Sequence, residues 1–136
     1  MAVISHHTAL IYVMVLMAAA DREMTDAELM TIGDIVRNLP IFKDYDAKQL
    51  TKAAQDCADL LAAEDGLKAV LGLIAEALPE KLSQTAYALA CDVAAADLYV
   101  GQEETRLLEI IRHRLGVGRL AAAAIERGAR VRHATL

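Results

Sequence analysis

The chain has 136 residues, which fits one domain over residues 1–136 and leaves no room for two. It holds 27 alanines and no tryptophan, and glycine (7) and proline (2) are scarce, so helices are favoured and a β-sandwich, a disordered chain and a disulfide scaffold are excluded. Residues 1–104 hold 17 acidic and 7 basic side chains, so this part of the chain would repel phosphate and we expect no nucleic-acid partner.

Hydrophobic periodicity predicts an all-α, compact bundle of about seven helices joined by short connections. The first helix is apolar on nearly all sides, so we expect it at the centre. Thr25 and Glu28 are spaced as a capping box, which predicts the start of the second helix. Pro40 and Pro79 stop the second and fourth helices, and Gly116 stops the sixth. In chain order the expected helices cover residues 5–20, 25–38, 47–63, 67–78, 83–96, 102–115 and 119–127.

The apolar stretch of residues 9–20 resembles a membrane or targeting segment at first sight. It is shorter than the roughly 20 residues that a transmembrane helix requires. Residues 2–8 contain no Lys or Arg, whereas a secretory signal begins with basic residues. A similar stretch also recurs inside the chain, which a signal peptide would not need. We therefore expect a cytoplasmic protein without a transmembrane segment.

Two segments 76 residues apart are similar to each other. Residues 17–39 and 93–115 each contain the end of an apolar helix with the sequence Ala-Ala-Ala-Asp, a polar turn, and an amphipathic helix that begins near a glutamate. We interpret this as an internal duplication, in which two helix–turn–helix units pack around an approximate twofold axis. The aligned acidic residues are Asp21 with Asp97 and Glu28 with Glu104.

The four aligned carboxylates are the best candidates for a functional site. The two aspartates are expected at helix C-termini, where the helix dipole disfavours a negative charge and a bound cation would offset the cost. Twofold packing would bring all four carboxylates together, and Ca²⁺ or Mg²⁺ prefers such oxygen ligands. Capping is the alternative role, through the capping box for one glutamate and through turns for the aspartates. The predicted metal ligands are Asp21, Glu28, Asp97 and Glu104.

Other polar residues favour structural roles. Asp92 lies in an apolar run, so it needs a structural partner such as an arginine, or it serves as an extra carboxylate beside the repeated aspartates. Cys57 and Cys91 lie in apolar helical runs and are expected to be buried free thiols. His6 and His7 are expected to face solvent. We find no catalytic triad, phosphate-binding glycine loop or dinucleotide motif, and we expect no enzyme.

The C-terminal segment of residues 105–136 is basic, because seven arginines stand against two glutamates. Its charge can pair with the acidic body of the chain, with an acidic partner or with anionic lipid. A solvated helix face is the simpler interpretation. The sequence leaves this role open.

The paired Ala-Ala-Asp…Glu segments on alanine-rich helices resemble the tellurite-resistance TerB family, whose superfamily includes the N-terminal domain of the co-chaperone DjlA. The resemblance covers most of the chain. It implies a cytoplasmic all-helical domain and a role in stress-response assemblies at the inner face of the membrane, without a known catalytic activity. It also implies acidic metal-site residues at Asp21, Glu28, Asp97 and Glu104.

We therefore expect a non-enzymatic, TerB-like stress-response protein that binds a divalent cation, Ca²⁺ or Mg²⁺, or a protein partner through its acidic turns. A co-chaperone-like adaptor is one alternative; it would recruit partners by its surface alone, because the J-domain signature is absent. A metal-dependent hydrolase is a weaker alternative, since it would need an additional base or histidine beside the metal. The partner and the oligomeric state stay open.

Overall fold

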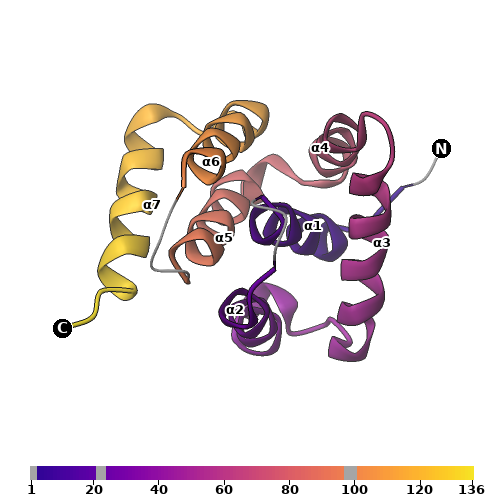
Figure 1. Cartoon of the computed structure of the whole chain (residues 1–136), viewed down its shortest axis with the longest axis horizontal. Helices are drawn as coiled ribbons and strands as arrows, with labels where there is room; N and C mark the ends of the chain where they lie inside the picture. The colour runs from indigo at the N-terminus through magenta and orange to yellow at the C-terminus, as the bar shows by residue number, and fades with distance from the viewer. Residues whose placement is uncertain (1–2, 21–23, 97–100) are drawn as a thin grey trace.

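The computed structural model describes residues 3–20, 24–96 and 101–136 of the chain (Figure 1). These ranges fold into α-helices and short 3-10 helices and contain no strand, so the all-α prediction is confirmed. The α-helices are α1 (His6–Ala18), α2 (Asp26–Asn38), α3 (Leu50–Ala62), α4 (Gly66–Ala77), α5 (Ser83–Ala96), α6 (Gln102–Leu115) and α7 (Arg119–Arg132). The 3-10 helices are η1 (Pro40–Phe42), η2 (Ala47–Gln49) and η3 (Glu80–Leu82).

Helix α1 forms the centre of the bundle. Every residue from Ala9 to Ala18 is at most 4% exposed. Helices α3 and α4 cover α1 on one side, while α2 and α5 cover it on the others (Figure 1). A helix that is enclosed in this way has no solvent-facing side, which explains why its sequence lacks a polar face.

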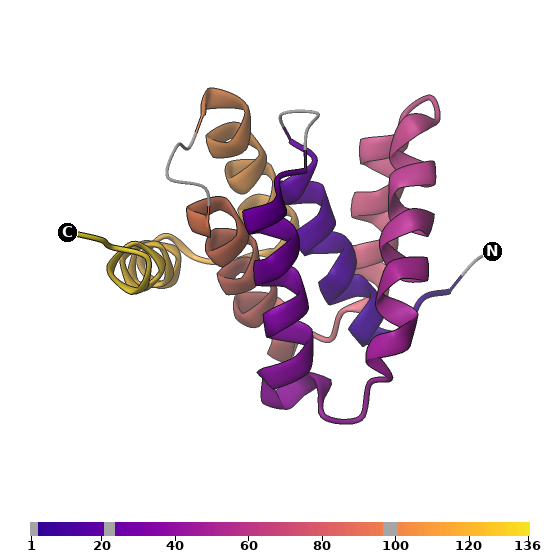
Figure 2. The ribbon, with the colours of Figure 1, turned by 60° about the horizontal axis from the view of Figure 1, so that its bottom comes forward.

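Helix α5 lies between α1 and α2 on one side and α6 and α7 on the other. It packs against α1, α2, α6 and α7, and it is the main contact of α7 (Figure 1). Helices α1 and α5 end toward the same end of the molecule, the top of Figure 2, and α2 and α6 begin there. The first residues of α2 and α6 are 76 positions apart, as the sequence offset requires, while the twofold relation between the two helix pairs stays a prediction.

Two tight turns depend on left-handed backbone. Asp65 has a φ of 56° at the start of α4, and Gly116 has a φ of 69° at the end of α6. Gly66 follows so closely on the end of α3 that a Cβ atom would lie 2.4 Å from the carbonyl oxygen of Leu60. Only glycine fits this close approach, so the short α3–α4 connection depends on Gly66.

The helix boundaries differ from the prediction mainly at α7. This helix continues to Arg132, beyond the expected end at residue 127 and through Gly128. Buried Ala129 and the ion pair between Arg132 and Asp92 hold this extension on α5. Tertiary contacts thus outweigh the poor helix propensity of glycine. Across the described ranges, no helix is long and apolar enough to cross a bilayer.

Candidate functional site

Two buried carboxylates mark the starts of α2 and α6. Glu28 is 2% exposed and Glu104 is 4% exposed, and they are the buried charged side chains of the described part of the chain. Each is the third residue of its helix, because α2 begins at Asp26 and α6 begins at Gln102. Burial of a carboxylate costs free energy unless nearby groups stabilise it, so both positions need an explanation.

For Glu28, the capping box supplies part of that explanation. Its Oε1 atom accepts hydrogen bonds from the backbone N–H and the hydroxyl of Thr25, each at 2.9 Å. The backbone N–H of Glu28 donates to Thr25 Oγ1 at 3.1 Å, which completes the predicted capping box. Both bonds from Thr25 to the carboxylate fall on Oε1.

The start of α6 lacks this arrangement. Its N-cap residue is Gly101, which has no side chain to accept the Glu104 N–H. The Thr105 hydroxyl instead donates to the Gly101 carbonyl oxygen at 3.1 Å. The buried glutamate therefore recurs at the third helical position where the capping threonine does not, so a capping box cannot explain both residues.

The TerB family profile, described as "Tellurite resistance protein TerB", matches residues 7–127. The chain belongs to the TerB family. No curated protein and no solved structure matches the chain. The matched range includes the four predicted ligands of this TerB-family chain.

Two of those ligands, Asp21 and Asp97, lie outside the described residues. The remaining two, Glu28 and Glu104, offer carboxylate oxygens, which are the donors that Ca²⁺ and Mg²⁺ prefer. Within residues 3–20, 24–96 and 101–136, no three His, Cys, Asp or Glu side chains are grouped closely enough to hold a metal ion. The described part of this TerB-family chain thus contains two of the four ligands that the metal hypothesis requires.

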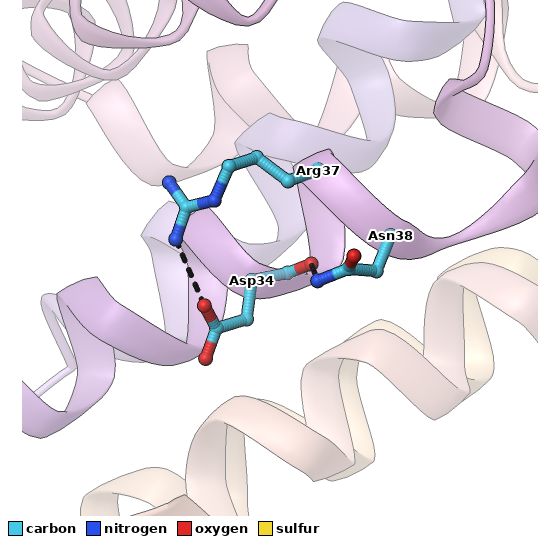
Figure 3. A network of polar contacts seen from close by, with 3 residues as sticks. All are labelled: Asp34, Arg37 and Asn38. Atoms are coloured by element: carbon cyan, nitrogen blue, oxygen red, sulfur yellow. Dashed lines mark hydrogen bonds and ion pairs between the residues drawn. The ribbon is translucent and has the colours of Figure 1, made fainter.

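Near the C-terminal end of α2, the exposed Asp34 makes ordinary surface contacts. Arg37 Nη2 donates to Asp34 Oδ1 at 2.8 Å, and Asn38 Nδ2 donates to the Asp34 carbonyl oxygen at 2.9 Å (Figure 3). These groups are exposed, so the ion pair contributes little to stability. Within α2, burial separates Glu28 from such ordinary surface pairs.

Asp92 and the cysteines take structural roles. Asp92 is partly buried and accepts a 2.6 Å hydrogen bond from Arg132 Nη2, with His133 Nε2 at 3.7 Å, so the predicted arginine partner is present. Cys57 and Cys91 are buried and free, as predicted. Burial raises the pKa of each thiol to about 12, so neither is an activated nucleophile near neutral pH.

The prediction that His7 faces solvent is wrong. Its side chain is half-buried, and Nε2 donates to the Ile41 carbonyl oxygen at 2.8 Å. The ring centroid lies 5.6 Å from that of Phe42 and 5.3 Å from that of Tyr45. The segment after α2 folds back onto the start of α1, a contact over 34 residues that local sequence patterns do not reveal.

One polar pair was missed by the sequence reasoning. The Tyr87 hydroxyl on α5 donates to Glu126 Oε2 on α7 at 2.6 Å. Desolvation, together with the hydrogen bond to Glu126, raises the pKa of Tyr87. Glu126 is the one acidic residue in the α7 sequence, whose other charged residues are all arginines, and that isolation was the available signal.

Proposed function

We propose that this TerB-family protein serves tellurite resistance as a non-enzymatic binding protein, and that Asp21, Glu28, Asp97 and Glu104 bind a divalent cation. The observation that carries the proposal is the burial of Glu28 and Glu104 at the same position of α2 and α6. Ca²⁺ and Mg²⁺ are the candidates, since both prefer oxygen ligands.

The physical argument rests on the cost of burying negative charge. The N-terminus of a helix favours a carboxylate, but typically by only about 0.3–1 kcal/mol. A divalent cation between two helix starts would interact with several carboxylates at once and offset their desolvation. The capping box of Thr25 and Glu28 is not repeated at Gly101, so capping alone does not explain why a buried glutamate recurs at the third position of both helices.

Thermal unfolding with and without cations tests the proposal. A cation present at one hundred times its dissociation constant should stabilise the protein by about 2.7 kcal/mol, and EDTA should reverse the shift. Glu104→Gln should abolish this gain. Glu103→Gln is the matched control, because Glu103 is the exposed neighbour on the same turn and should retain the full response.

The aspartates separate cation binding from capping. Under the cation proposal, Asp21→Asn and Asp97→Asn abolish the cation response and leave the metal-free protein as stable as before. Under capping alone, no cation shifts the melting temperature. The Asn variants then keep a capping oxygen and nearly the original stability, whereas Asp21→Ala and Asp97→Ala each cost about 0.5–2 kcal/mol. The absence of a shift with Ca²⁺, Mg²⁺, Mn²⁺ and Zn²⁺ would refute the cation site.

Binding of a protein partner within a stress-response assembly is the second candidate function. Helix α2 exposes Leu29 (47%) and Met30 (68%) next to the buried Glu28. Exposed Asp26 on the same helix adds negative charge to this apolar surface, whereas the charge of Asp34 is paired with Arg37. A partner with an apolar surface rimmed by basic residues would complement both features.

A cell assay distinguishes the two roles. Replacing Leu29 and Met30 together by serine should lower tellurite resistance in cells that depend on this protein, while the melting temperature and the cation response of the purified protein stay unchanged. Glu104→Gln should lower resistance and abolish the cation response together. Full resistance with the double serine variant would exclude this surface as the partner site.

A further inference from the structure

A cavity of about 310 Å³ is lined by residues of α5, α6 and α7, and neither Glu28 nor Glu104 is among them. The three helices lie next to one another in Figure 1. The cavity volume is at the lower end of the range typical of small-molecule sites. Its apolar walls come from all three helices and consist of Ala94, Ala95, Leu108 and Ala129. The three alanines have short side chains and leave room for a narrow aliphatic group.

A defined polar group borders the cavity. Glu126 is half-buried, and its Oε2 atom accepts the 2.6 Å hydrogen bond from the buried Tyr87 hydroxyl. This bond holds the carboxylate against α5 through Oε2, and among the described residues no hydrogen bond to Oε1 is found, so Oε1 can accept one from a ligand. The Cys91 thiol also lines the cavity, but burial keeps it protonated and uncharged at neutral pH.

The charges that line the cavity favour a cation. Glu109 on α6 and Glu126 on α7 contribute two carboxylates, whereas Arg130 contributes one positive charge. Glu126 and Arg130 are four residues apart on α7, yet Glu126 bonds to Tyr87 on the neighbouring helix. The net negative lining beside apolar walls matches a small molecule that has one ammonium group and a short aliphatic tail.

We propose that this cavity binds a small aliphatic amine in its protonated form. The ammonium group donates to Glu126 Oε1, and the aliphatic tail lies against the alanines of α5 and α7. Glu109 adds long-range attraction at the cavity, while Arg130 opposes the ligand charge. This site does not depend on cation binding by the proposed metal ligands.

Titration of the whole protein by NMR with n-butylammonium, 1-butanol and butyrate tests the proposal. The three probes have similar apolar tails and differ in charge. A ligand with five non-hydrogen atoms can reach a dissociation constant on the order of 1 mM. We expect saturable binding of butylammonium, and binding at least tenfold weaker for butanol and for butyrate. Equal binding of butanol, or no saturable binding of butylammonium, would overturn the proposal.

Three substitutions locate the site and identify the ligand class. Glu126→Gln should weaken butylammonium binding at least tenfold, and its amide oxygen can still accept from Tyr87, so the fold is preserved. Ala95→Leu should fill the cavity and block binding. Arg130→Gln should tighten butylammonium binding severalfold, because it removes a like charge beside the cavity. Weaker butylammonium binding would contradict an ammonium group held among these charges and would overturn the proposal.

Glu103→Gln is the charge-matched control, since Glu103 is exposed on α6 and does not line the cavity. It should bind butylammonium as the unmodified protein does. Equal weakening by Glu103→Gln and Glu126→Gln would show that the amine responds to the overall negative charge and would exclude the cavity as its site. Circular dichroism of each variant verifies that the helices are retained.

Discussion

Helices α1 and α5 are adjacent in the bundle, yet they present different chemistry to their surroundings. At the 76-residue offset, three apolar residues of α1 correspond to three polar or polarisable residues of α5. The pairs are Ile11 with Tyr87, Val15 with Cys91, and Leu16 with Asp92. In α5, Tyr87 and Asp92 hold α7 through Glu126 and Arg132. At these three positions α1 contributes only apolar packing, while α5 also holds a surface helix and lines a cavity.

This difference shows how related segments can divide structural tasks. An enclosed helix gains stability from every apolar group, which explains why the buried part of α1, Ala9–Ala18, is almost entirely apolar. Helix α5 is covered by α7 along one face, and the polar contacts there fix how α7 sits. We expect substitutions in α1 to change stability most, and substitutions between α5 and α7 to change stability little but binding strongly.

The largest expected effect is truncation in α1. Leu10 is fully buried, so Leu10→Ala should lower the free energy of unfolding by about 2–5 kcal/mol. At the corresponding position of α5, Ala86→Gly should cost about 0.5–1 kcal/mol. Urea unfolding measures both, with exposed Leu120→Ala as the unchanged control. Equal costs at Leu10 and Ala86 would contradict the division between the helices.

Alkaline pH should destabilise the protein through its thiols. The folded-state pKa of Cys57 and of Cys91 is raised from 9.0 to about 12, so the stabilisation is complete below pH 9 and is lost as the pH rises toward 12. Each thiol should lower the unfolding free energy by up to about 1.4 kcal/mol per pH unit in this window. Cys91→Val places at this position the residue type that α1 has at Val15. It should remove the contribution of one thiol to the decrease of unfolding free energy with pH, and an unchanged pH dependence would contradict the raised pKa of Cys91.

The helix starts that follow α1 and α5 should respond differently to capping changes. Thr25→Ala removes the hydroxyl of the capping box and should cost about 1 kcal/mol. Gly101→Ser, which adds a capping side chain to α6, should gain a few tenths of a kcal/mol. Thermal unfolding under metal-free conditions measures both. A large gain at Gly101 would mean that α6 is limited by its missing cap.

The smallest expected effect concerns the ion pair between α5 and α7. Asp92→Asn should cost less than about 1 kcal/mol, because Arg132 is largely exposed and solvent screens the charges. Salt at 1 M should remove most of the difference between this variant and the original chain. A loss that persists in high salt would show that Asp92 acts through buried packing instead.

Much of the fold follows from local sequence patterns. Apolar periodicity and helix-breaking residues predicted the positions of the helices. The predicted capping box of Thr25 and Glu28 is present, and the cysteines in apolar runs, Cys57 and Cys91, are buried. These features depend on residues within a few turns of each other. The end of α7 was misplaced, because Arg132 is held in the helix by a contact 40 residues away.

The candidate site was predictable in part. The repeat in the sequence identified Glu28 and Glu104 as corresponding residues. Their burial depends on how the helices pack, which the spacing of residues in the sequence does not predict. The bond between Tyr87 and Glu126 joins residues 39 positions apart. No local sequence pattern links these two residues. The cavity between α5, α6 and α7 therefore could be found only in the three-dimensional structure.

The burial of both cysteines also bears on the chemistry of oxidative stress. Peroxides and electrophiles react with the thiolate and need access to sulfur. Both thiols have pKa values near 12, so little thiolate forms at neutral pH, and Cys57 is also fully buried, whereas Cys91 borders the cavity between α5, α6 and α7. We therefore expect both thiols to react slowly with oxidants at neutral pH, and Cys57 more slowly than Cys91.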